Sequence, residues 1–133
     1  MPVLKLPNGV NVSYFSHPDP TPSPSRPTVV LLTAVVQRAD TQYVPQYRDE
    51  QLKGFNLLGF DVHGHGDTTG RDKWDYADNA ADIVEGVKQL GVDKFFIYGT
   101  SNGGITAQEV AIRYPELVRG LSMYTSALSP SPY

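Results

Sequence analysis

The sequence contains no cysteine, so disulfides, thiolate catalysis and cysteine-ligated zinc are all excluded. No apolar run approaches the ~20 residues that a membrane span requires. Basic residues number 11 against 14 acidic ones, a net charge of −3, so the excess positive charge that favours nucleic acid or an anionic membrane is missing. The opening residues, MPVLK, show no apolar leader segment, and a cytoplasmic location is the expectation.

What the chain does have is enough apolar material for a core. Hydrophobic residues make up 40 % of its 133 residues and charged residues 19 %, which suits one small domain or part of a larger one. Five prolines fall within residues 17–27, which predicts a loop, and residues 125–133 form a tail rich in serine and proline. No domain boundary is visible, so residues 1–133 are interpreted as a single partial domain.

Strand and helix patterns alternate along the chain. Two short β-prone runs flank Asn8-Gly9, a pair that favours a type I′ hairpin turn. Later apolar runs predict buried strands at 28–36, 55–62, 94–98 and 118–124. Helices are predicted at 43–53, at 76–90 with Asp72 or Asp75 as its cap, and at 102–114. Such alternation predicts an α/β fold with a mostly parallel sheet, whose sites form at the carboxyl ends of the strands.

One motif lies where such a site is expected. Gly99-Thr100-Ser101-Asn102-Gly103 follows the strand 94–98 and opens the helix 102–114, which places G-x-S-x-G on a strand-to-helix turn. A serine there exposes its hydroxyl beside the unpaired N–H groups of a helix N-terminus, and Gly99 and Gly103 permit the close packing that the turn requires. The alternative is a tight turn in which Ser101 only caps the helix.

With this motif, two other segments resemble the α/β-hydrolase family. The run Phe60–Thr68 is similar to the family's D-x-R-G-x-G-x-S turn, with His63 in place of arginine and Thr68 in place of serine. Residues 114–121, YPELVRGL, are similar to the run that follows the family's nucleophile helix. The resemblance implies a doubly wound, mostly parallel sheet with an N-terminal β-hairpin, as in a truncated α/β-hydrolase fold. It also implies Ser101 as nucleophile, with the N–H groups of Asn102 and Val35 as oxyanion donors.

The rest of a catalytic triad is missing from the sequence. A serine nucleophile needs a general base, which in this family is a histidine that follows it in the chain. No histidine follows Ser101, and the only later carboxylates are Glu109 and Glu116. His65 is expected to be structural rather than the base. The main hypothesis is therefore a serine hydrolase or its N-terminal part, acting on small ester- or amide-like substrates without a cofactor and weak or inactive as this chain. The alternative is a non-catalytic remnant or binding module.

Two further expectations complete the analysis. His63-x-His65-x-Asp67 resembles the H-x-H-x-D-H run of metallo-β-lactamase-type hydrolases, with Thr68 in place of the final histidine, and is weighed as a metal-dependent hydrolase site. The alternative is a glycine-rich turn with polar side chains in solvent. The turn is preferred, and no metal site is predicted. The resemblance to the α/β-hydrolase family also implies that the strand 118–124 is an open sheet edge and that the sheet faces at 29–32 and 95–97 are partly bare. An exposed edge of this kind predicts self-association or a protein partner.

Overall fold

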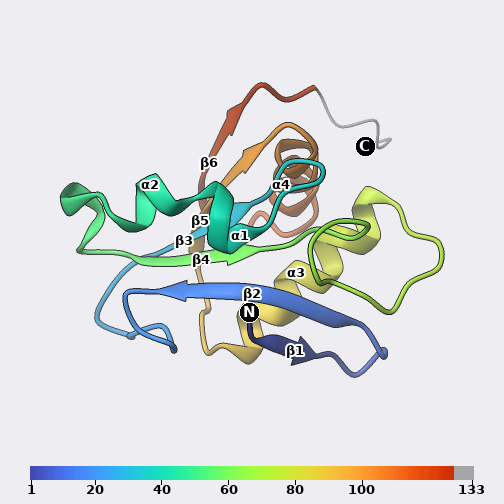
Figure 1. Ribbon diagram of the computed structural model, residues 1–133, viewed down its shortest axis with the longest axis horizontal. Coiled ribbons are helices and arrows are strands. Elements are labelled where there is room, and N and C mark those ends of the chain that lie inside the picture. Colours follow the sequence, from blue (N-terminus) through green and yellow to red (C-terminus); the bar gives the residue numbers. More distant parts are fainter. Residues whose placement is uncertain (128–133) are drawn as a thin grey trace.

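The computed structural model describes residues 1–127, which form one six-stranded sheet in the order β1-β2-β4-β3-β5-β6 (Figure 1). The strands are β1 (Val3–Lys5), β2 (Asn11–His17), β3 (Thr28–Leu32), β4 (Asn56–Phe60), β5 (Phe95–Thr100) and β6 (Val118–Tyr124). β1 and β2 form an antiparallel hairpin, and β2 joins β4 antiparallel, whereas β4, β3, β5 and β6 are parallel to one another. The predicted mostly parallel α/β sheet with an N-terminal hairpin is confirmed.

The helices cover the two faces of this sheet unequally (Figure 1). They are α1 (Ala39–Gln42), α2 (Val44–Tyr47), the 3₁₀ helix η1 (Glu50–Leu52), α3 (Tyr76–Gln89) and α4 (Asn102–Arg113). α3 and α4 supply the main core on one face, where Ile83, Val84 and Val110 pack against buried strand residues such as Val30 and Ile97. The short α1 and α2 supply only a small cluster on the other face, in which Tyr43 and Tyr47 contact Leu31 and Leu57.

The predicted strands 55–62 and 94–98 are shifted by one or two residues at their ends, and three larger details of the sequence prediction are wrong. β3 ends at Leu32, not at residue 36, because Ala34 N and Val36 N donate to the Gln42 and His65 side chains instead of to a neighbouring strand, and Val36 itself has a non-strand φ of 54°. Residues 43–53, predicted as one helix, form α2 and η1, with α1 before them. Tyr43 and Asp49 are non-helical, and Pro45 is the second residue of α2. The hairpin turn spans five residues from Leu6 to Val10, and only Gly9 has a positive φ, so it is not type I′.

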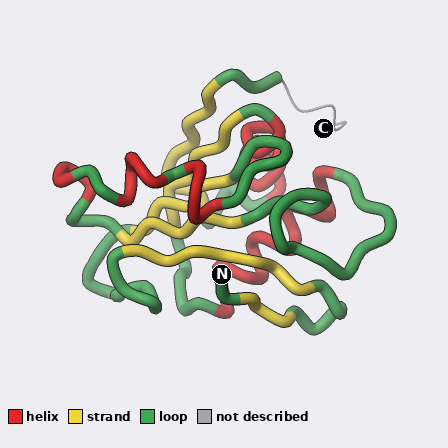
Figure 2. Tube along the Cα trace, in the orientation of Figure 1, coloured by secondary structure: helices red, strands yellow, loops and turns green. Residues whose placement is uncertain are grey.

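The long loop between β4 and α3, residues 61–75, leaves the sheet at the same end as the loop after β3 (Figure 2). It ends in a capping box, in which the Asp75 side chain accepts from Asp78 N and the Asp78 side chain accepts from Asp75 N. Asp75 is thus the cap, rather than Asp72. Because β3, β4 and β5 are parallel, their carboxyl ends lie at the same edge of the sheet, together with the loops that follow them.

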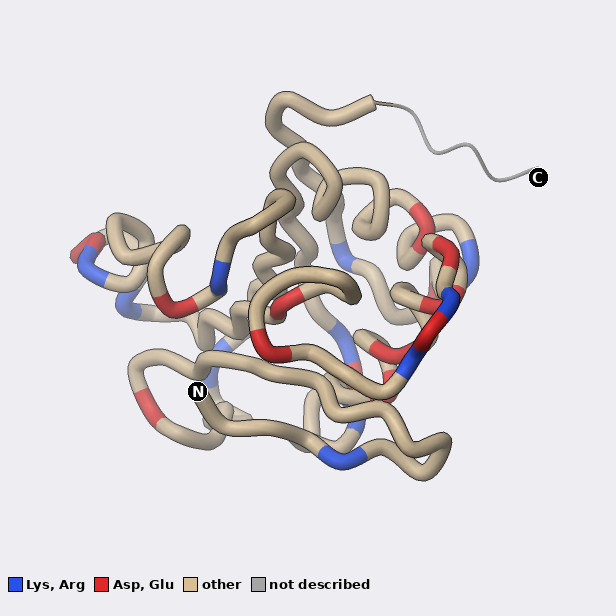
Figure 3. Tube along the Cα trace, turned by 45° about the vertical axis from the view of Figure 1, so that its right-hand side comes forward, with Lys and Arg blue, Asp and Glu red and all other residues tan. Residues whose placement is uncertain are grey.

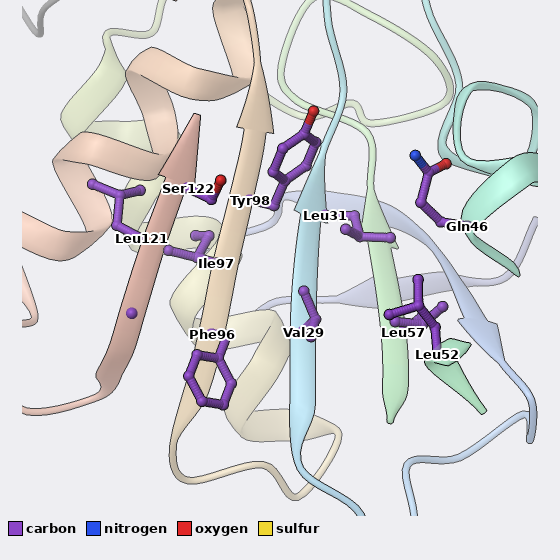
Figure 4. A pocket seen from close by; sticks show the side chains of 11 residues that line it. Val29, Leu31, Gln46, Leu52, Leu57, Phe96, Ile97, Tyr98, Leu121 and Ser122 are labelled. Carbon is purple, nitrogen blue, oxygen red and sulfur yellow. The ribbon is translucent and has the colours of Figure 1, made fainter. Parts of the chain in front are cut away.

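The second sheet face is less bare than expected: Phe96 is exposed and Val29 is half-buried, but Leu31 is buried. Val29, Leu31 and Phe96 line an apolar groove of about 470 Å³ between α2 and β6 (Figure 4). β6 pairs only with β5 among the described residues, and Leu121, Met123 and Tyr124 on it are exposed. Residues 128–133 of the tail lie outside the described residues.

Charged positions do not gather by sign. Lys and Arg positions lie beside Asp and Glu positions along the chain, most visibly over the α3 side (Figure 3). No helix in residues 1–127 combines the length and the apolar character needed to cross a membrane.

Candidate active site

Ser101 occupies a strained turn between β5 and α4. Its φ of 53° and ψ of −118° lie outside the regions that L-residues normally adopt, a conformation that costs about 1–3 kcal/mol and is kept only where the surroundings impose it. Its N–H donates to Tyr124 O (3.0 Å), and its carbonyl oxygen accepts from Gly104 N (2.9 Å) and from Ser126 Oγ (3.0 Å). The backbone on both sides of the side chain is thus fixed to β6 and α4.

Glycine is required around Ser101 because the backbone segments meet closely. A Cβ on Gly103 would lie 2.5 Å from Thr33 O and 2.6 Å from the carbonyl carbon of Leu32. A Cβ on Gly99 would collide with the carbonyl oxygen of Gly103 and lie 2.6 Å from Gly104 N. The first turn of α4 therefore touches the end of β3, which brings the loop after β3 next to the serine.

That loop is held by side chains from two other segments. Ala34 N donates to Gln42 Oε1 (2.9 Å), and Val36 N donates to His65 Nδ1 (3.1 Å). Between them, the N–H of Val35 has no hydrogen-bond partner within residues 1–127. The loop thus presents a free donor at Val35, the position where the resemblance expects an oxyanion donor.

Asn102 follows Ser101 as the first residue of α4. Its side chain is buried, its Oδ1 accepts from the Tyr76 hydroxyl (2.8 Å), and its Nδ2 has no partner in the described part of the chain. Its backbone N–H belongs to the first turn of a twelve-residue helix, where N–H groups have no intrahelical acceptor. This end of α4 therefore carries a positive partial charge beside Ser101.

The turn after β4 is organised by the buried carboxylate of Asp61. Its Oδ1 accepts from Ala39 N (2.8 Å) at the start of α1, and its Oδ2 accepts from Asp67 N (3.0 Å) across the turn. Thr68, which replaces the family's serine, donates to Asp61 O (2.8 Å) and accepts from Ser13 N (3.0 Å). The turn therefore links the hairpin, α1 and β4.

His63, which replaces the family's arginine, belongs to a buried ionic network. Its Nε2 lies 2.9 Å from Asp82 Oδ2 on α3, and Arg71 makes two hydrogen bonds to the same carboxylate at 2.8 and 3.0 Å. Burial by itself would raise the pKa of the Asp82 carboxyl, but hydrogen bonds from His63, Arg71 and Asn8 outweigh burial and hold that pKa well below its usual range. The network fastens the 61–75 loop and the hairpin to α3.

The three candidate metal ligands have separate partners. His63 contacts Asp82, His65 Nδ1 accepts from Val36 N, and Asp67 pairs with Arg38 at 3.1 Å. Residues 1–127 contain no group of three or more His, Asp or Glu side chains placed to hold a metal ion. Each of the three side chains thus has a structural contact in the turn, and His63 is buried rather than in solvent as the alternative expected.

Glu109, the first carboxylate after Ser101, lies about two turns along α4, roughly 11 Å from the first residue of the helix. It is fully buried and pairs with Arg113 at 2.7 Å.

Sequence reasoning missed three residues that hold parts of the site. Gln42 binds Ala34, Arg71 binds Asp82, and Tyr76 binds Asn102. No motif marks these three residues, since each acts through a contact between segments far apart in the sequence.

The model of the alpha/beta hydrolase fold family matches residues 27–132. The chain belongs to this family. Serine hydrolase BPHL of Homo sapiens is 30 % identical over 100 residues, a match that covers 72 % of this chain and 34 % of that protein. The chain thus spans about a third of the length of this curated relative.

Solved structures give the same fold. A hydrolase from Pseudomonas aeruginosa PA01 superposes with a TM-score of 0.82 at 21 % identity, covering 97 % of this chain and 48 % of that one. The enol-lactonase from Burkholderia xenovorans LB400 gives a TM-score of 0.81 at 20 % identity, covering 95 % and 47 %. At these identities the likeness establishes the fold.

Proposed function

We propose that this chain carries the nucleophile part of a serine hydrolase site, in which Ser101 attacks the carbonyl carbon of a small ester- or amide-like substrate. The N–H groups of Asn102 and Val35 would stabilise the negative charge that develops on the carbonyl oxygen. Gly99 and Gly103 would have the supporting role of letting β5, α4 and β3 approach one another. No cofactor enters this chemistry.

The observation that carries the proposal is the backbone conformation of Ser101. A non-glycine residue with a φ of 53° and a ψ of −118° between a strand and a helix is costly, and such strain is kept mainly where function uses it. A serine that only capped α4 would need no such conformation, since caps normally have extended backbone, and the Ser101 side chain makes no capping hydrogen bond. Family membership and the similarity to serine hydrolase BPHL support the same assignment.

Turnover needs a base to take the proton from Ser101 Oγ, and no histidine follows Ser101 in these 133 residues. We therefore expect ester hydrolysis by this chain near background, although the residual acceleration from binding and an oxyanion hole can reach roughly 10³ over water. The absence of this base favours a second candidate, a binding module that keeps the fold without catalysis.

A cytoplasmic location is also part of the proposal, and cell fractionation tests it.

The test is covalent labelling with a fluorophosphonate probe, followed by mass spectrometry of the labelled peptide. The proposal expects slow, stoichiometric modification of Ser101 in the folded chain and none in Ser101→Ala. Ser122 on β6 provides a matched control, because Ser122→Ala removes an exposed hydroxyl and should leave the labelling rate unchanged. Labelling that persists in Ser101→Ala, or is absent from the wild-type chain, would favour the binding module.

We also propose that the chain associates with itself through β6. The edge of β6 leaves backbone N–H and C=O groups unpaired within the described residues, and Leu121 and Met123 beside it are 40 % and 42 % exposed. An apolar edge of this kind favours pairing with another strand. The partner of the proposed catalytic site, by contrast, is a small molecule, and the mixed distribution of charge supports neither nucleic acid nor an anionic membrane.

A further inference from the structure

The loop after β3 contains three successive backbone amides, at Ala34, Val35 and Val36. The first and third donate hydrogen bonds to side chains, and the second has no partner among the described residues. Ala34 N–H and Val36 N–H bind Gln42 Oε1 and His65 Nδ1, and the Val35 N–H between them has no partner within residues 1–127. Two side-chain acceptors thus bracket the donor that the proposed function uses. If either anchor were lost, the peptide groups on that side of Val35 would be free to rotate.

The His65 anchor matters more than the Gln42 anchor, because the backbone is strained on its side. Val36 has a φ of 54°, which is unfavourable for a β-branched residue, and its side chain is 83 % exposed, so packing contributes little to holding it there. The hydrogen bond from Val36 N–H to His65 is what opposes relaxation of this peptide. Gln42, in contrast, holds Ala34, which directly follows the Thr33 carbonyl that touches the first turn of α4.

Both anchors depend on one rigid base. Asp61 holds the start of α1, which carries Gln42, through Ala39 N, and it holds the turn that carries His65 through Asp67 N. His65 is therefore placed by a buried carboxylate rather than by a freely moving loop. This geometry also defines its protonation form: Nδ1 accepts a hydrogen bond and carries no proton, so a neutral ring carries its proton on Nε2.

We propose that His65 is a positioning residue that holds the loop after β3 in the shape in which the Val35 N–H is free to bind an oxyanion. The inference rests on the proposed function, because it assigns His65 a role in the same oxyanion site. His65 transfers no proton in this role, and its Nδ1 lone pair is already used by Val36 N–H. This distinguishes the role from that of a general base.

The experiment compares His65→Asn with His65→Leu in the full chain. Asparagine carries Oδ1 on Cγ, where histidine carries Nδ1, so it keeps an acceptor for Val36 N–H. Leucine has nearly the same volume as histidine but no acceptor. Two readouts are measured: hydrogen exchange of the Val36 amide, and the second-order rate of Ser101 phosphonylation. Asparagine cannot act as a general base, so rescue by His65→Asn separates positioning from proton transfer.

We expect His65→Leu to slow phosphonylation about tenfold, less than the 10²–10³-fold cost of deleting an oxyanion donor outright. Hydrogen exchange of the Val36 amide should become at least tenfold faster in His65→Leu. His65→Asn should restore both the phosphonylation rate and the exchange rate to near wild type. The melting temperatures of all three chains should be equal. Long-range ¹H–¹⁵N spectra of the wild type should show Nδ1 of His65 without a proton.

Two results would overturn the inference: equal phosphonylation rates in His65→Leu and wild type, or equal loss in His65→Asn and His65→Leu. The proposed function fails in a different way, through absence of Ser101 labelling in the wild type. In that case the exchange comparison alone decides whether His65 holds the loop.

Discussion

Replacement of Gly103 by alanine tests whether the first turn of α4 packs against β3 as tightly as the site requires. The added Cβ would lie 2.5 Å from Thr33 O and 2.6 Å from the Leu32 carbonyl carbon, about 1 Å inside ordinary van der Waals contact. Both neighbours are backbone atoms, one at the end of the central strand β3 and one just beyond it, and neither can rotate away as a side-chain tip can. Overpacking of this kind costs about 1–3 kcal/mol of unfolding free energy.

In a domain of this size, 1 kcal/mol corresponds to about 4 °C in melting temperature, so Gly103→Ala should melt roughly 4–12 °C below wild type. Thermal unfolding followed by circular dichroism measures the difference. Gly54→Ala is the matched control, because no atom lies within 4 Å of its Cβ position and its φ is ordinary; its stability should stay within about 0.5 kcal/mol of wild type. If Gly103→Ala and Gly54→Ala had the same melting temperature, the close approach of α4 to β3 would be refuted.

Three further predictions concern other parts of the chain. Ser101→Gly should raise stability by about 1 kcal/mol while abolishing labelling, because glycine adopts a positive φ without strain; a lower melting temperature would contradict the strain argument. Wild type should lose stability as pH falls below the unfolded pKa of about 3.9 and on toward the folded pKa, because the folded pKa of the Asp82 carboxyl is depressed and its contribution is fully present only above the unfolded value. Urea titrations at several pH values measure the unfolding free energy, which should fall less with acid in Asp82→Asn than in wild type. Parallel curves of unfolding free energy against pH for the two chains would argue against a depressed Asp82 pKa. Leu121→Lys with Met123→Lys should reduce self-association by size-exclusion chromatography and lower dye binding, whereas a monodisperse wild-type monomer without dye binding would refute association at β6.

The parts of the fold that follow from local pattern were predictable. Val118–Tyr124 is a strand over its predicted residues, and the Asp75 cap and the strand-to-helix turn at Ser101 lie where expected. In these segments the apolar periodicity and the capping residues agree with the tertiary structure. The resemblance to the α/β-hydrolase family added the expectation that the strand 118–124 is an open edge of the sheet, and β6 is the last strand in the order.

The parts that failed depend on contacts between distant segments. Residues 33–36 are apolar and β-branched, which predicts strand, but the chain turns there because Ala34 and Val36 bind Gln42 and His65 instead of a neighbouring strand. Likewise, no local pattern predicts that Arg71 and Asn8 join His63 at Asp82. Such polar anchors are set by three-dimensional packing, which sequence spacing does not encode.

The hydrogen bonds of Ser101 have a consequence for β6. Its N–H is held by Tyr124 O, at the end of the edge strand, and its carbonyl oxygen by Ser126 just beyond that strand. Fraying at the edge would therefore loosen the proposed nucleophile, while a strand added beside β6 would steady it. Thermodynamic linkage makes this coupling reciprocal, so a covalent adduct that orders Ser101 should strengthen whatever associates with the β6 edge.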